Sequence, residues 1–234
     1  MWSGPRNLST AMMYSFAARG DCAVWDEPFY APYLAASGAD HPLRSEILSA
    51  HETDPDVVAN ACAGSVSGAK TAFYMKHMPH HMLDGFPLDW AKDCVNVHLI
   101  RHPARVMASY SAKREKMTMA DIGFEQQVRV FNVLGGIVVD SDDIRRDPPG
   151  MLQRLCAEIG IPYTSRMLSW PKGGRKEDGA WAPHWYGAVH NSTGFAGPEG
   201  PLPGVSAASR TIFNHAENMY QEMTQHRITL GRNG

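Results

Sequence analysis

The sequence predicts an α/β fold of three layers, in which a parallel sheet is flanked by helices on both faces. Three short apolar runs, at 22–25, 94–100 and 137–139, have the length and composition of buried strands. Segments with helical periodicity or helix-starting residues lie between these runs. Because the chain has 234 residues, of which 44% are hydrophobic, we expect one domain, residues 1–234, with a single core.

The first half of the chain is expected to alternate between helices and strands. Glycine and proline mark several boundaries, because glycine ends helices and proline fits the first helical turn. The expected elements are a helix from Ser9 to Gly20, a strand at 22–25, a helix through 33–35, irregular polar chain at 38–52, a helix at 54–63 and a strand at 69–77.

The second half continues this alternation and closes with a long helix. The apolar positions of that last helix, from Ile212 to Met223, fall on one stripe. The expected elements are a short helix near 87–90, a strand at 94–100, a helix at 104–116 that Pro103 begins, a helix at 124–134, a strand at 137–139, a helix at 149–159, a Gly- and Pro-rich loop region at 170–205 and a helix at 209–228.

Composition and charge narrow the partners and the location. A net charge of −2 predicts that nucleic acid is not a partner. No apolar run has the length of a membrane span and no signal-peptide pattern opens the chain, so we expect a cytoplasmic protein. The four cysteines are widely spaced and form no CxxC pair, which predicts reduced thiols. The oligomeric state, a homodimer included, stays open.

The opening loop, Gly4-Pro5-Arg6-Asn7-Leu8-Ser9-Thr10, leads into an apolar helix and is a candidate anion site. Ser9 and Thr10 lie where a helix N-cap and first turn are expected. A helix N-terminus with free N–H donors binds phosphate or sulfate, and an ordinary capped helix is the alternative. If the loop follows a central strand, only Met1 and Trp2 remain to form it. Either that strand is very short or the chain begins later than its relatives do.

Charged side chains follow three of the expected strands. Glu27 follows the strand at 22–25, Lys76 and His77 end the strand at 69–77, and Arg101 follows the strand at 94–100. Ligands of open α/β sheets bind beyond the carboxyl ends of the strands. We therefore expect these groups to converge with the opening loop on one crevice.

Three of these segments resemble sulfotransferases that use 3′-phosphoadenosine 5′-phosphosulfate (PAPS). The segment 101–109 resembles the 3′-phosphate motif of that family, with Arg101 at a strand end, a proline two residues later and Ser109 on the following helix. The segment 5–10 resembles the 5′-phosphosulfate loop. Lys76-His77-Met78-Pro79 resembles the segment that carries the catalytic histidine of the family.

The resemblance extends over most of the chain in the expected order. Residues 138–140 and 147–162 are similar to the strand and helix that follow in that fold. Gly179-Ala180-Trp181, preceded by Arg175 and Lys176, weakly resembles the loop that covers the cofactor. The implied fold is the P-loop-like sulfotransferase architecture.

The implied activity is transfer of a sulfuryl group from PAPS to a hydroxyl or amine of a small-molecule acceptor, with adenosine 3′,5′-bisphosphate as product and no required metal. Such a transfer depends mainly on positioning and charge stabilisation, as phosphoryl transfer does. The opening loop with Arg6 would hold the phosphosulfate, and Arg101 with Ser109 would hold the 3′-phosphate. Lys76 would assist the bridging oxygen.

An acceptor hydroxyl or amine also needs a base. His77 is the first candidate, because a neutral imidazole takes up a proton near pH 7, and Glu27 is the second. Each residue has a structural alternative: a capping or core role for His77, a salt bridge for Glu27 and a surface ion pair for Arg101.

The sequence departs from the family pattern at three positions of the opening segment. Leu8 stands where the family usually has glycine, and Arg6 replaces the commoner lysine. Ala11 occupies a position that often holds an adenine-stacking tryptophan. The source of adenine stacking, the identity of the acceptor and the choice between O- and N-sulfation stay open.

Two other classes of function compete with this interpretation: a P-loop nucleotide kinase or NTPase, and a non-catalytic nucleotide-binding protein. The chain lacks the motif G-x-x-x-x-G-K-[ST], which argues against a kinase or NTPase. His77 and Glu27 at strand ends argue against a non-catalytic role. The histidines His77, His80 and His81 have no cysteine or carboxylate cluster beside them, so we expect no metal site.

Overall fold

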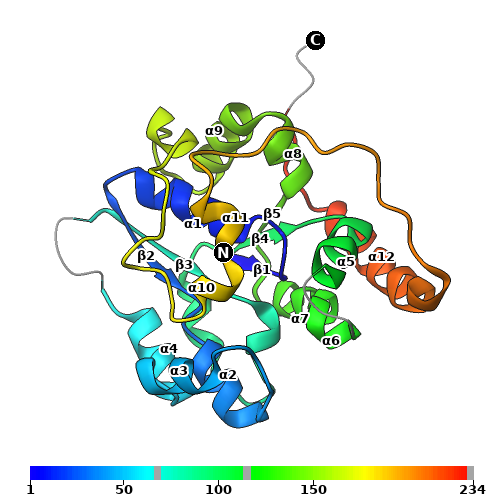
Figure 1. Ribbon diagram of the computed structural model, residues 1–234. Coiled ribbons are helices and arrows are strands. Elements are labelled where there is room, and N and C mark those ends of the chain that lie inside the picture. The colour runs from blue at the N-terminus through cyan, green and yellow to red at the C-terminus, as the bar shows by residue number, and fades with distance from the viewer. Residues whose placement is uncertain (66–69, 113–116, 231–234) are drawn as a thin grey trace.

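The computed structural model describes residues 1–65, 70–112 and 117–230. Within them a parallel sheet forms the centre of the molecule (Figure 1), as the sequence predicts. Its strands are β1 (Trp2–Ser3), β2 (Cys22–Asp26), β3 (Ala72–Lys76), β4 (Val97–Ile100) and β5 (Ile137–Asp140).

The two-residue strand β1 joins the two parts of this sheet. β1 pairs with β4, β4 with β5 and β2 with β3, all in parallel. On its other side β1 meets the end of β3, where the Ser3 N–H donates to the His77 carbonyl at 3.0 Å and the His77 N–H donates to the Met1 carbonyl at 2.8 Å. The strand order is therefore β2-β3-β1-β4-β5. The strand before the opening loop is thus very short, which is one of the two alternatives that the sequence left open.

Helices and short 3-10 turns connect the strands of this sheet. Most of these helices cross over between parallel strands, as the parallel pairing demands. The helices are α1 (Ser9–Ala18), α2 (Tyr30–Ser37), α3 (Arg44–Ala50), α4 (Pro55–Ala63), α5 (Pro103–Ser111), α6 (Met119–Ile122), α7 (Phe124–Leu134), α8 (Ser141–Arg146), α9 (Pro148–Glu158), α10 (Ala182–Trp185), α11 (Gly187–His190) and α12 (Arg210–Thr224). The 3-10 turns are η1 (Pro79–His81), η2 (Asp89–Asp93), η3 (Ser165–Leu168) and η4 (Ala207–Ser209).

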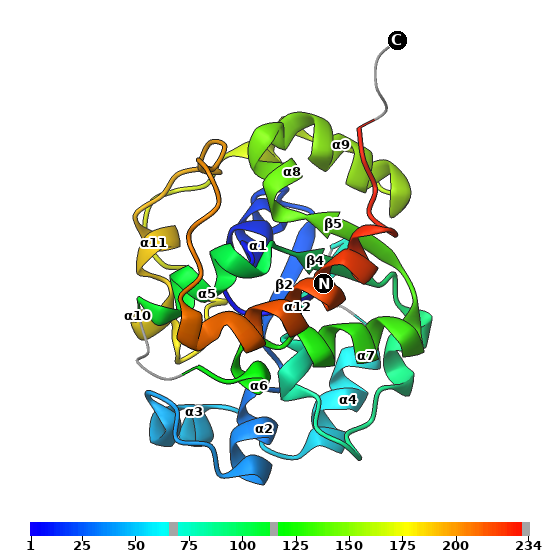
Figure 2. The ribbon, with the colours of Figure 1, turned by 90° about the vertical axis from the view of Figure 1, so that its right-hand side faces the viewer.

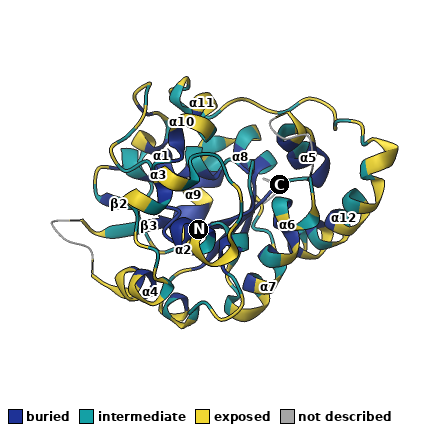
Figure 3. Ribbon diagram, turned by 60° about the horizontal axis from the view of Figure 1, so that its bottom comes forward, coloured by how far each residue is buried: buried dark blue, intermediate teal, exposed yellow. Residues whose placement is uncertain are grey.

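Helices cover both faces of the sheet. Neighbouring strand residues point to opposite faces, so Leu99 packs with α1, α9 and η3, whereas Ile100 packs with α5, α7 and α12. α12 lies against α7 and α5 (Figure 2). Figure 3 shows buried residues gathered on the sheet and on the inner sides of the helices. This arrangement is the three-layer α/β fold that the sequence predicts.

Some predicted elements differ from those observed. The segment 38–52, expected to be irregular, contains α3, because Ile47 is fully buried among Tyr30, Leu34 and Trp181 and so fixes one helical face. The last helix ends at Thr224, because the Ile228 N–H donates to the carbonyl of Val138 at 2.9 Å and that segment runs beside β5 instead.

Other differences concern boundaries. The loop region 170–205 includes the one-turn helices α10 and α11. α5 ends at Ser111, and residues 113–116 of the predicted helix lie outside the described residues, as does residue 69 of the predicted strand. The helices of the described segments include none with both the length and the apolarity that crossing a bilayer needs.

Candidate functional site

The opening loop connects β1 to α1 in a backbone conformation that is costly for its residues. Arg6 has φ 65° and Leu8 has φ 80°, in the left-handed region that glycine favours. A non-glycine residue there costs about 1–2 kcal/mol, and such strain concentrates at functional sites. The Asn7 amide donates to the Leu99 carbonyl at 3.2 Å, which ties the loop to β4.

The first turn of α1 has no side-chain cap. Ser9 is the first helical residue and Leu8 is the N-cap, which makes no side-chain capping hydrogen bond. The expectation that Ser9 is the N-cap is therefore wrong, because Leu8 takes the capping position, whereas Thr10 lies in the first turn as expected. Because no side-chain cap occupies them, the first N–H groups of α1 are candidate donors to an anion.

Arg101 and Ser109 flank this loop, as their positions around Pro103 predict. Pro103 is the first residue of α5, so Arg101 lies at the end of β4 and Ser109 two turns along the helix. The Arg6 Nε donates to the Ser109 Oγ at 2.9 Å, and the Arg101 Nη1 donates to the Arg6 carbonyl at 2.5 Å. Burial, and then the charge of Arg101, lower the pKa of Arg6. Two cations held this close favour an anion between them.

A second polar group lies at the ends of β2 and β3. The Lys76 ammonium is buried and donates to Asp26 at 2.9 Å, to Glu27 at 2.5 Å and to the Tyr186 hydroxyl at 2.6 Å. The Tyr186 hydroxyl in turn donates to Asp26 at 2.8 Å and accepts from the Trp181 indole at 2.9 Å. Asp26 and Lys76 are register partners, so parallel pairing of β2 and β3 brings these charges together.

Burial and the neighbouring charges together determine the protonation of this group. Burial raises the pKa of Glu27, although the charge of Lys76 lowers it in part. Burial opposes the charged form of Lys76, but Asp26 and Glu27 raise the pKa of Lys76 above its ordinary value. The lysine therefore stays charged, and Glu27 is a carboxylate whose proton affinity is increased.

Two histidines of η1, His80 and His81, line the same cavity as Glu27. The His81 Nδ1 lies 3.9 Å from the Glu27 Oε2, and its ring stacks on Tyr30 at 4.4 Å between centroids. Burial lowers the pKa of His80 to about 4 and the pKa of His81 well below its ordinary value. Both imidazoles are thus neutral near pH 7.

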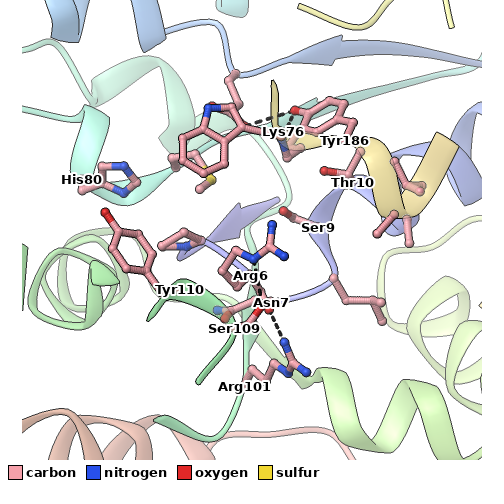
Figure 4. Close-up of a pocket in the computed structure, with 18 of the residues that line it drawn as sticks. Arg6, Asn7, Ser9, Thr10, Lys76, His80, Arg101, Ser109, Tyr110 and Tyr186 are labelled. Carbon is pink, nitrogen blue, oxygen red and sulfur yellow. Dashed lines mark hydrogen bonds and ion pairs between the residues drawn. The ribbon is translucent and has the colours of Figure 1, made fainter. Parts of the chain in front are cut away.

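One cavity of about 350 Å³ connects the opening loop with the buried lysine (Figure 4). Figure 4 shows Arg6, Ser9 and Thr10 facing Lys76 and Tyr186 across this cavity. Its lining includes residues 5–11, Glu27, Lys76, His80, His81, Arg101, Ser109 and Tyr186. The structure therefore brings together Pro5 to Thr10, Arg101, Ser109, Lys76 and Glu27. Gly4 lies behind the loop, where a Cβ would lie 3.1 Å from the Ile122 carbonyl oxygen.

His77 lies outside this cavity. Its ring stacks on Trp2 at 4.6 Å and lies 5.1 Å from the ring of Trp90. Neither ring nitrogen has a hydrogen-bond partner among the described residues, and burial lowers the pKa of His77 well below its ordinary value. Consecutive residues at a strand end point to opposite faces, so Lys76 reaches the cavity and His77 does not.

Arg175 and Lys176 also lie away from the cavity. The Arg175 guanidinium lies 5.7 Å from the Tyr14 ring and 3.3 Å from Glu177, and Lys176 is exposed. Arg101 forms an ion pair with Glu199, which lies further along the chain, between α11 and α12. Among the described residues, no cluster of three or more histidine, cysteine or carboxylate side chains has the arrangement of a metal site.

Sequence reasoning missed several residues of this region. Asp26 precedes Glu27 at the same strand end, and that adjacency was a usable signal. Tyr186, Glu199 and Arg145 carry no such signal, because contacts between residues far apart in sequence bring them to the site.

Comparison with known proteins shows the family of this chain. A family model described as "Sulfotransferase domain" matches residues 1–227. Among solved structures, the chain is similar to the "Sulfotransferase Domain from the Curacin Biosynthetic Pathway", with a TM-score of 0.51 and 13% identity over 98% of this chain and 90% of that one. That identity supports the fold alone.

Two curated relatives from Arabidopsis thaliana are more similar in sequence. They are "Branched-chain-amino-acid aminotransferase-like protein 1", which is 40% identical, and "Branched-chain-amino-acid aminotransferase-like protein 2", which is 37% identical. Each match covers 204 residues, or 85% of this chain. The matched region is 36% of each relative, so the chain spans about a third of their length. By its family match and its fold, the chain belongs to the sulfotransferase-domain family.

Proposed function

We propose that this protein transfers a sulfuryl group from PAPS to a hydroxyl or amine of a small-molecule acceptor. The observation that carries the proposal is the shared cavity. It is lined at one side by the opening loop with Arg101 and Ser109 and at the other by Glu27 and Lys76. A transferase that moves an anionic group needs both halves: cations to hold the donor and a base near the acceptor.

The donor set fits a nucleotide that carries phosphates at both ends. The uncapped start of α1, Arg6 and the hydroxyls of Ser9 and Thr10 are suited to the 5′-phosphosulfate. Arg101 and Ser109 are suited to a 3′-phosphate, which distinguishes this nucleotide from ATP. When bound, PAPS supplies the sulfuryl group and a phosphate leaving group.

The residues at the other side of the cavity suit proton transfer. Glu27 accepts the proton of the acceptor, and its raised pKa brings its basicity closer to neutral pH than that of an ordinary carboxylate. Lys76 holds Glu27 in place through a bond of 2.5 Å and contributes positive charge to this part of the cavity. Since His77 lies outside the cavity, we assign the role of base to Glu27 and a packing role to His77.

The test is turnover with PAPS and a pool of alcohols, phenols and amines. The proposal predicts an acceptor whose mass rises by one sulfuryl group, together with an equal amount of adenosine 3′,5′-bisphosphate. A parallel reaction with ATP and Mg²⁺ examines the kinase alternative. Phosphorylated acceptor in that reaction, with no sulfated product from PAPS, would assign the protein to the kinase class. Binding of PAPS without turnover of any acceptor class would favour a non-catalytic nucleotide-binding protein.

A further inference from the structure

Three arginines converge on a single carboxylate beside the proposed 3′-phosphate site. The Arg101 Nε donates to the Glu199 Oε2 at 3.2 Å, and its Nη2 forms a second, shorter bond to Oε1. The Arg145 Nη1 lies 2.8 Å from Oε1, and the Arg105 Nε lies 3.4 Å from Oε2. The arginines come from the end of β4, from α5 and from α8, so three separate elements build one anion site.

This site is largely closed to solvent and unbalanced in charge. The four side chains are 11–19% exposed, and three positive charges face one negative charge. Burial disfavours the carboxylate, yet the hydrogen bond and charge of Arg101, with Arg145 and Arg105, keep the pKa of Glu199 below its ordinary value. A phosphate monoester, with up to two charges and three oxygens, matches three guanidinium groups better than one carboxylate does.

Glu199 belongs to an extended connection that it fastens to the fold. We call residues 194–203, between α11 and α12, the strap; Figure 1 shows it crossing the molecule in orange. The residues on each side of Glu199, at 196–198 and 200–202, are exposed. The strap backbone forms two further bonds with these arginines: Arg145 donates to the Gly197 carbonyl at 2.8 Å and Arg105 to the Gly200 carbonyl at 2.6 Å.

We propose that Glu199 is a built-in substitute for the nucleotide 3′-phosphate, and that a bound 3′-phosphate displaces Glu199 together with the strap. The inference rests on the proposed function, because it takes Arg101 as a ligand of that phosphate. Both anions use the guanidinium of Arg101, and holding a buried carboxylate against a phosphate is unfavourable. When Glu199 leaves, Arg105 and Arg145 lose their carboxylate partner and become further ligands of the phosphate.

An internal competitor lowers the apparent affinity for the ligand that must displace it. Glu199→Gln keeps the shape of the side chain and removes its charge. We expect this variant to bind adenosine 3′,5′-bisphosphate roughly tenfold more tightly than the wild type in calorimetric titrations, because the competing anion is gone. Binding of adenosine 5′-phosphate, which has no 3′-phosphate, should be unchanged. Glu177→Gln, which alters a glutamate away from the cavity, is the matched control and should change neither affinity.

A second measurement uses the wild-type chain alone. A glutamate-specific protease cleaves after Glu199 only when the strap leaves the arginines, and mass spectrometry identifies the cut between Glu199 and Gly200. We expect adenosine 3′,5′-bisphosphate to accelerate this cleavage and adenosine 5′-phosphate to leave its rate unchanged.

The outcomes separate this inference from the proposed function. Unchanged or weaker bisphosphate binding by Glu199→Gln, or protection of the Glu199–Gly200 bond by the bisphosphate, overturns the inference and leaves the proposed function standing. No binding of the bisphosphate to either the wild type or the variant overturns both.

Discussion

Lys76→Met removes the only cation bonded to two buried carboxylates in the described part of the site. The ammonium donates at 2.9 Å to Asp26, at 2.5 Å to Glu27 and at 2.6 Å to the Tyr186 hydroxyl. Methionine is one atom shorter than lysine but has a similar volume, so little volume is lost while the charge disappears. Breaking one partner of a buried ion pair costs about 3–5 kcal/mol, which is a large part of the roughly 5–15 kcal/mol that stabilises a typical domain.

Urea unfolding measures this cost directly. With a slope of about 1–3 kcal/mol per molar urea, the midpoint should fall by about 2 M at neutral pH. The effect should shrink on acidification. The pKa of Glu27 in the folded state lies above its ordinary value. Below the pKa of the unfolded state the carboxyl is protonated and its burial costs little stability. This stability is lost as the pH rises through the folded-state pKa, because the buried carboxyl then ionises. Removing Lys76 strengthens this dependence, because its charge lowers the pKa of Glu27 in the wild type.

Lys92→Met is the matched control for this measurement. Lys92 pairs with Asp89 at 2.5 Å, as Lys76 pairs with Glu27, but both side chains of that pair are exposed, at 59% and 89%. Its substitution should leave the urea midpoint unchanged. A loss below about 1 kcal/mol for Lys76→Met, or a loss that does not depend on pH, would refute the buried ion network.

Three further substitutions test the assigned roles. Arg101→Ala should weaken binding of adenosine 3′,5′-bisphosphate by about 1.5–3 kcal/mol in calorimetry, because a charged hydrogen bond is lost; unchanged affinity would remove Arg101 from the site. Glu27→Gln should lower turnover with PAPS by roughly 10²–10⁴ while nucleotide affinity is retained. Wild-type turnover should fall as pH drops through the raised pKa of Glu27, since only the ionised carboxylate accepts a proton; full activity of the variant would exclude Glu27 as base. His77→Phe, which keeps a ring between Trp2 and Trp90, should retain turnover within about threefold and stability within about 1.5 kcal/mol; loss of turnover in a stable variant would return the role of base to His77.

The sequence predicts the fold closely because its signals are local. Apolar runs bounded by glycine, proline and charged residues locate β2, β4 and β5, and Pro103 fixes the start of α5. The helix α3 was missed because a single fully buried residue, Ile47, anchors a short segment whose other residues are exposed or only partly buried. That contact depends on tertiary packing, which local propensity does not encode.

The site residues also divide into those that local sequence signals predict and those that only tertiary contacts bring together. The positions of Glu27, Lys76 and Arg101 follow from the rule that strand ends share one edge of a parallel sheet. The orientation of His77 follows from strand alternation, since Lys76 already takes the inward direction. Glu199 and Tyr186 lie 98 and 110 residues from the side chains that they contact, and the Gly- and Pro-rich region that holds them has no periodicity to read.

The central claim is that this cavity holds a nucleotide by phosphates at both of its ends. The most direct measurement is calorimetric titration of the wild-type protein with adenosine 3′,5′-bisphosphate, adenosine 5′-phosphate and ATP with Mg²⁺. The bisphosphate should bind at least about tenfold more tightly than the 5′-phosphate, because Arg101 and Ser109 contact the additional phosphate. ATP with Mg²⁺ should bind no more tightly than the 5′-phosphate. Equal affinity for all three nucleotides, or a preference for ATP with Mg²⁺, would contradict the account.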